Sequence, residues 1–168
     1  MRQMTKKLSV AVAVAVMIVS GPIVAKGGTV SDLAAYAGKY PYDKVKGVSF
    51  LDHPKVRAAI EMAVPVGDIR DIVLSGEGVT VPIVKTQGRL FSRTFDPASG
   101  GDVNWAVLMV ADGSKAAVCY STGVEKDVRG ADWYLDGKIA FTLYEMCPST
   151  AAEVESAVSN WPIGPIPG

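Results

Sequence analysis

Histidine and cysteine are scarce in this chain, which has one His and two Cys among 168 residues. A zinc site takes three or four His, Cys or carboxylate ligands, so a His-rich or Cys-rich metal cage is excluded. The chain also has no net charge, because 17 Lys and Arg balance 17 Asp and Glu. Nucleic-acid-binding domains carry a strongly basic surface, so this balance argues against a nucleic-acid partner.

Motifs of common enzyme classes are also missing. The chain has no Gly-rich phosphate loop after a predicted strand, no HExxH and no CxxC. A Ser/His/Asp or Cys/His site would have to use His53, the single imidazole, as its base. Pro54 follows it at a predicted helix start, where Asp52 or His53 would cap the helix. We therefore expect a protein that is not an enzyme and takes no cofactor; the weaker alternative is a hydrolase that depends on His53.

The N-terminus carries an uncharged, mostly apolar run. Three basic residues precede this run, residues 8–20, and Gly21 and Pro22 end it before Ala25. A helix of this length spans about 20 Å, less than the roughly 30 Å of a bilayer core. The pattern is typical of a secretory signal peptide, residues 1–25, cleaved near Ala25; the alternative is an uncleaved anchor.

Cleavage there would give a periplasmic or secreted protein with 14 basic and 17 acidic residues, a net charge of −3. Cys119 and Cys147 both remain in this mature chain. In an oxidising compartment two cysteines most simply form one disulfide, which would stabilise the fold by roughly 3–4 kcal/mol. The alternatives are a catalytic thiol with His53 as its base and two free buried thiols.

Apolar residues at helical spacing and a capping box at 150–153 predict helices near 32–37, 54–64, 68–75 and 151–158. From Val79 the apolar period changes to two, which is typical of strands. Pro82 lacks a backbone donor, so its strand is expected at a sheet edge. The charged stretch 125–132 is expected to be a loop. The predicted strands are 79–83, 89–95, 104–111, 115–122 and 138–145.

This order of elements predicts one α+β domain over residues 26–161. Helices that precede a run of strands pack against the sheet as a separate layer. We expect an antiparallel sheet of about five strands with helices packed on one face. Residues 162–168 are expected to form a Pro/Gly-rich C-terminal tail.

The segment between the second and third predicted strands is the best candidate for contact with a partner. It is rich in turn-forming residues, and binding residues concentrate on loops that a rigid scaffold holds. The alternative is an ordinary solvated connection. The candidate binding residues are Arg93, Asp96, Pro97, Ser99, Gly100, Gly101 and Asp102.

Five stretches spread along most of the mature chain are similar to one known family. They are YPYDKV (40–45), FLDHPKVRAAIEMAV (50–64), VTVPIVKTQGRLF (79–91), WAVLMVADGSKAAVCYS (105–121) and the DGKIAF…CP ending (136–148). Together with the polar loop 94–104, they resemble the inhibitors of vertebrate lysozyme. The resemblance implies an exported protein whose protruding loop occludes a lysozyme active site. In that family a Cys-Lys-Pro-His-Asp-Cys loop inserts its imidazole among the enzyme's catalytic carboxylates.

The chain departs from the family within that loop. Residues 94–102, TFDPASGGD, include Asp96, Pro97 and Asp102 but neither His nor Cys. Without the loop-closing disulfide we expect a less preorganised loop, which would weaken binding. No cation is left at the apex, and Arg93 is the nearest substitute.

Two functions follow from the sequence. The first is occlusion of a lysozyme or related cell-wall hydrolase by the loop 94–103. The alternative is a periplasmic, non-enzymatic module of the same fold with another protein or small-ligand partner, which predicts an aromatic pocket near Trp105, Tyr120 and Trp133. Neither function involves a nucleic acid, or a membrane after signal cleavage. Nothing in the sequence indicates an oligomeric state.

Overall fold

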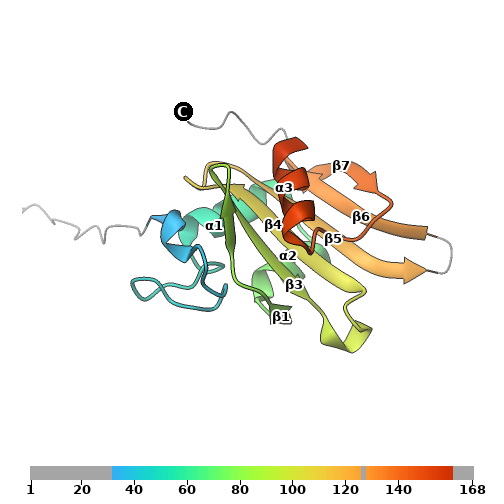
Figure 1. Ribbon diagram of the computed structural model, residues 1–168, viewed down its shortest axis with the longest axis horizontal. Coiled ribbons are helices and arrows are strands. Elements are labelled where there is room, and N and C mark those ends of the chain that lie inside the picture. The colour runs from blue at the N-terminus through green and yellow to red at the C-terminus, as the bar shows by residue number, and fades with distance from the viewer. Residues whose placement is uncertain (1–31, 126–127, 161–168) are drawn as a thin grey trace, which may run out of the picture. The chain divides into compact units, whose positions relative to one another are not determined.

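The computed structural model describes residues 32–125 and 128–160. The predicted signal peptide, 1–25, and the predicted tail, 162–168, lie outside the described residues. Within these ranges, seven strands form one antiparallel sheet that three α-helices accompany (Figure 1). The prediction of a mixed α+β fold is therefore confirmed. No helix in this part of the chain is long and apolar enough to cross a membrane.

Two α-helices precede the strands and one α-helix follows them. The helical elements are η1 (Leu33–Tyr36), α1 (Pro54–Ala63), α2 (Asp68–Ser75), η2 (Pro97–Ser99) and α3 (Ala151–Asn160), where η marks a 3₁₀ helix. The strands are β1 (Val79–Thr80), β2 (Val84–Thr86), β3 (Arg89–Phe95), β4 (Val103–Val110), β5 (Ala116–Glu125), β6 (Val128–Leu135) and β7 (Lys138–Leu143). They lie in the order β1-β3-β4-β5-β6-β7, and β2 also pairs with β3.

Alternate residues of the central strands build two apolar cores, because successive side chains of a strand point to opposite faces. In β4, Trp105, Val107 and Met109 belong to the core that includes buried residues of α1 and α2. Ala106 and Leu108 belong to the core that includes buried residues of α3. The sheet is therefore covered on both faces.

Helix α3 lies on the face opposite α1 and α2 (Figure 1), so the prediction that the helices share one face is wrong. Its buried residues Val154 and Val158 share a core with Leu108 and Trp133. The physical reason lies in β4, which is apolar at both alternating sets of positions. A strand of that kind needs cover on two sides.

The sheet also has more strands than the five predicted. The predicted strand 79–83 ends at Thr80, and Pro82 lies between β1 and β2. Both of these short strands pair with β3 at the sheet edge, as expected for a strand with proline.

The second difference is β6, which overlaps the stretch 125–132 that was predicted to be a charged loop. Trp133 of β6 is 2% exposed, and its strand pairs with both β5 and β7. The charges that precede Trp133 in the sequence concealed the alternation.

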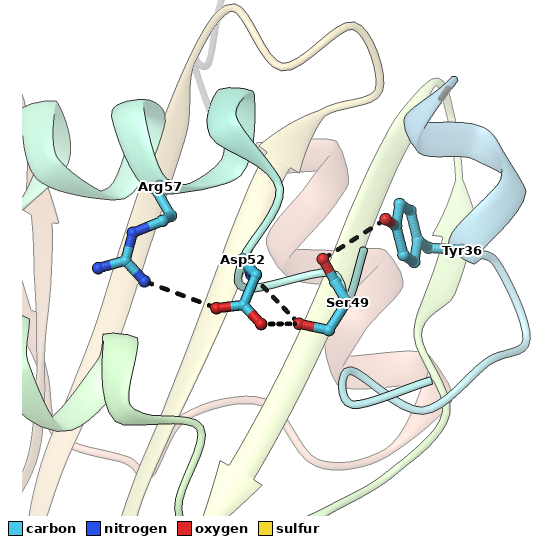
Figure 2. A network of polar contacts seen from close by, with 4 residues as sticks. All are labelled: Tyr36, Ser49, Asp52 and Arg57. Carbon is cyan, nitrogen blue, oxygen red and sulfur yellow. Dashed lines mark hydrogen bonds and ion pairs between the residues drawn. The ribbon is translucent and has the colours of Figure 1, made fainter. Parts of the chain in front are cut away.

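A polar network fixes the segment before α1 (Figure 2). The Tyr36 hydroxyl donates to the backbone carbonyls of Val48 at 2.8 Å and Ser49 at 3.4 Å. The Ser49 hydroxyl donates to the Asp52 carboxylate at 2.6 Å, and Arg57 lies 3.9 Å from the same carboxylate. These contacts hold the chain at the start of α1.

His53 caps α1, as one of the two residues predicted for that role. Its Nδ1 accepts a hydrogen bond from the Lys55 backbone N–H, and the side chain is 1% exposed. The ring also makes an edge contact with Tyr36. The single imidazole is thus part of the buried helix start.

The predicted disulfide between Cys119 and Cys147 is confirmed. Cys119 belongs to β5, and Cys147 lies in the connection between β7 and α3. Both cysteines are buried in the core beneath α3. The bond therefore ties the last helix to the centre of the sheet.

Candidate functional site

The candidate loop projects from the sheet beyond the ends of β3 and β4, where η2 forms its yellow-green tip (Figure 1). The two strands pair as far as Phe95 and Asn104. Beyond that pair, the Asp96 backbone N–H donates to the Val103 carbonyl at 2.9 Å. A regular ladder thus leads directly into the loop, so its orientation is set by two inner strands.

Hydrogen bonds within the loop fix its conformation. Asp96 caps η2, because its Oδ1 accepts from the Ala98 backbone N–H at 2.8 Å. The Ser99 hydroxyl donates to the Asp96 carbonyl at 2.8 Å and accepts from the Val103 N–H at 2.9 Å. Gly100 ends η2 in the left-handed region with φ 70°, where glycine carries no steric penalty. These bonds link the two ends of the loop to each other.

Asn104 anchors the far side of the loop, a role that the sequence did not suggest. Its Nδ2 donates to the backbone carbonyls of Asp102 at 2.9 Å and Gly101 at 3.3 Å. The residue is fully buried at the base of β4. The available signal was a single amide at the start of an otherwise apolar strand. A buried amide usually has a hydrogen-bonding role.

Arg93 does not join the other candidate residues at the apex. It lies in β3 opposite Ala106, and its guanidinium carbon is 5.7 Å from the centre of the Phe95 ring. Burial lowers the pKa of the Arg93 guanidinium, and the Glu153 carboxylate of α3 opposes this effect. Arg93 therefore lies in β3 beside the Phe95 ring, before the turn of the loop begins. Its role as a substitute for the missing cation stays a prediction.

The charge of the loop itself is negative. Asp96 and Asp102 are its ionisable residues, and residues 94–103 contain no Lys, Arg or His. Asp102 is exposed, and its Cα and Cβ pack over Gly123 of β5, where an added Cβ would lie 2.8 Å from the Asp102 Cβ. The apex can therefore offer carboxylates, a hydroxyl and backbone groups to a partner.

Two clefts flank the loop. The first, of about 730 Å³, lies between α3 and the β6–β7 side of the sheet and reaches Asp102. The second, of about 630 Å³, is lined by the other side of the loop together with Trp105 and Tyr120. Trp133 lines the first cleft on the opposite face, so the prediction of one pocket shared by the three aromatic residues is wrong.

Among the described residues, no group of three His, Cys, Asp or Glu side chains is placed to hold a metal ion. Comparisons with protein families, curated proteins and solved structures gave no match to the chain.

Proposed function

We propose that the mature protein is an exported, non-enzymatic binding protein that uses the loop 94–103 to occlude a lysozyme or another peptidoglycan hydrolase. The observation that carries the proposal is a projecting acidic loop whose two ends are joined by its own hydrogen bonds. A loop ordered before binding loses less conformational entropy when it docks. It can therefore bind through a small contact area.

Export is supported by the signal-like N-terminus and by the disulfide. Disulfides persist in oxidising compartments such as the bacterial periplasm. Cys119 and Cys147 form a buried bond, as expected for a protein of that compartment. We therefore place the mature protein in the periplasm or outside the cell, where cell-wall hydrolases act.

The chemistry of the contact differs from that of the similar family. Residues 96–102 contain no imidazole and no other cation, and Arg93 lies in β3, so the turn of the loop has no cation to insert between catalytic carboxylates. Asp96 and Asp102 instead favour basic groups at the rim of the enzyme's cleft. Carboxylates opposite a basic surface speed association and select the partner. The mature chain's net charge of −3 acts in the same direction.

A pull-down with a panel of muramidases tests this proposal. We expect the protein to retain at least one muramidase, and Asp102→Lys to reduce the retained amount by about tenfold through charge reversal. Glu155→Lys, which makes the same charge change on an exposed site of α3, serves as the matched control. Retention of no muramidase at micromolar protein, or equal losses for both variants, would contradict it.

A further inference from the structure

The second cleft has an aromatic floor. Trp105 and Tyr120 are direct partners in the β4–β5 ladder, so their side chains lie next to each other on the face that α1 and α2 cover. Trp105 is 5% exposed and Tyr120 is half-buried. Both line the cleft. A ligand in this cleft would therefore meet the Tyr120 ring and the small part of the Trp105 indole that is accessible.

Gly78 allows the chain after α2 to pass close to this floor. A Cβ at that position would lie 3.3 Å from Cη2 of Trp105 and 2.8 Å from the Phe95 carbonyl oxygen. Its φ of 102° is also a conformation that side chains disfavour. A glycine here thus lets the backbone after α2 lie directly against the Trp105 indole.

The rim of the cleft is negative. Asp71 and Glu77 come from α2 and the segment after it, and Asp96 comes from the candidate loop. In the described part of the chain, no Lys, Arg or His lines this cleft. The nearby Arg70 is directed elsewhere, because it donates to the backbone carbonyls of Val64 and Glu61. The three acidic residues thus line the cleft from two separate segments of the chain.

Tyr120 reports the same electrostatic environment. Burial raises the pKa of its hydroxyl, and the Asp96 carboxylate raises it further. Burial disfavours a charge of either sign at this position, whereas the Asp96 carboxylate disfavours a second negative charge and would attract a cation.

We infer that this cleft binds a small organic ammonium ion between the Trp105–Tyr120 floor and the Asp71, Glu77 and Asp96 carboxylates. An ammonium group over an aromatic face gains cation–π attraction, and Trp is the best ring for it. Apolar substituents on the nitrogen would contact Pro97 and the rings. A neutral molecule of the same shape lacks both electrostatic contributions. The inference does not depend on the hydrolase proposal, since no enzyme takes part in its test.

Choline is a suitable probe, and its neutral carbon analogue, with a tert-butyl group in place of trimethylammonium, is the matched control ligand. We expect choline to bind the purified protein with millimolar affinity and to shift the NMR signals of the Trp105 indole N–H and the Gly78 backbone N–H. We expect Asp71→Asn combined with Glu77→Gln to weaken binding by about tenfold. Both residues are exposed, so the variant keeps its fold.

A control variant separates this site from general charge attraction. Glu61→Gln combined with Glu155→Gln removes the same charge from exposed positions outside the cleft and should leave choline binding unchanged. The inference is overturned if choline does not bind, if the neutral analogue binds equally well, or if both double variants weaken binding to the same extent.

Discussion

At the scale of single residues, the candidate site depends on side chains that hold the loop more than on those that a partner would touch. Asn104 and Ser99 bind backbone groups on both sides of the loop. Asp96 has two roles, since it caps η2 and also contributes charge. Asp102 is the acidic residue whose carboxylate can be changed with the least effect on the loop.

Replacing Asn104 tests whether the loop is held from its base. Asn104→Ala leaves the Gly101 and Asp102 carbonyls without their buried donor, and we expect a loss of about 1–3 kcal/mol in the free energy of unfolding. Urea unfolding measures the loss, and hydrogen exchange should be faster at the loop amides. The control Asn160→Ala removes an exposed amide at the end of α3 and should change stability by less than about 0.5 kcal/mol. Equal effects of the two variants would show that the loop does not depend on Asn104.

At the scale of elements, α3 is held by a capping box at its start and by the disulfide before it. The Glu153 carboxylate accepts from the backbone N–H groups of Ser149 at 2.7 Å and Thr150 at 3.0 Å. These bonds lower the pKa of Glu153 below its ordinary value of 4.5. The box was predicted from the sequence, because its spacing is specific.

The Glu153 cap gives α3 a pH-dependent contribution to stability. Since the folded pKa is below the unfolded one, this contribution is complete above the unfolded pKa of 4.5 and is lost as the pH falls through the folded value. Glu153→Gln can still cap but does not titrate, so its stability should fall less over that range. Thermal unfolding measured from neutral to acidic pH tests this. The control Glu155→Gln should follow the parent protein, and identical pH profiles for all three would contradict the prediction.

The disulfide should account for a larger share of the stability. Reduction removes the constraint between β5 and the segment before α3, and we expect a loss of roughly 3–4 kcal/mol. Denaturant unfolding with and without reductant measures it. The double variant Cys119→Ala, Cys147→Ala should show a similar loss and no further response to reductant. An unchanged midpoint after complete reduction would contradict this account.

Sequence patterns predicted those elements that local chemistry determines. Pro54 after a capping residue marked the start of α1, and a chain with only two cysteines left one simple pairing. The face covered by α3 was not predictable, because Val154 and Val158 specify a buried stripe without saying which side of the sheet it meets. The strand β6 was missed because charges obscured its period.

At the scale of the whole molecule, a sheet covered on both faces leaves its β3–β4 end free to present an acidic loop. The loop separates two clefts, and each cleft includes part of it: Asp102 in the first, Asp96 and Pro97 in the second. A partner that binds around the loop would therefore contact both faces of the sheet near the β3–β4 connection. If the proposed signal peptide is cleaved, the excess of acidic residues that remains would favour a basic partner at longer range.

Muramidase turnover in the presence of increasing mature protein is the most direct measurement of the central proposal. We expect turnover to fall until about one molecule of the protein is present per molecule of muramidase. A variant in which residues 97–101 are shortened to a two-residue turn should remain folded and leave turnover unchanged. Full inhibition by the shortened variant, or no inhibition of any lysozyme class by the parent protein, would contradict the account.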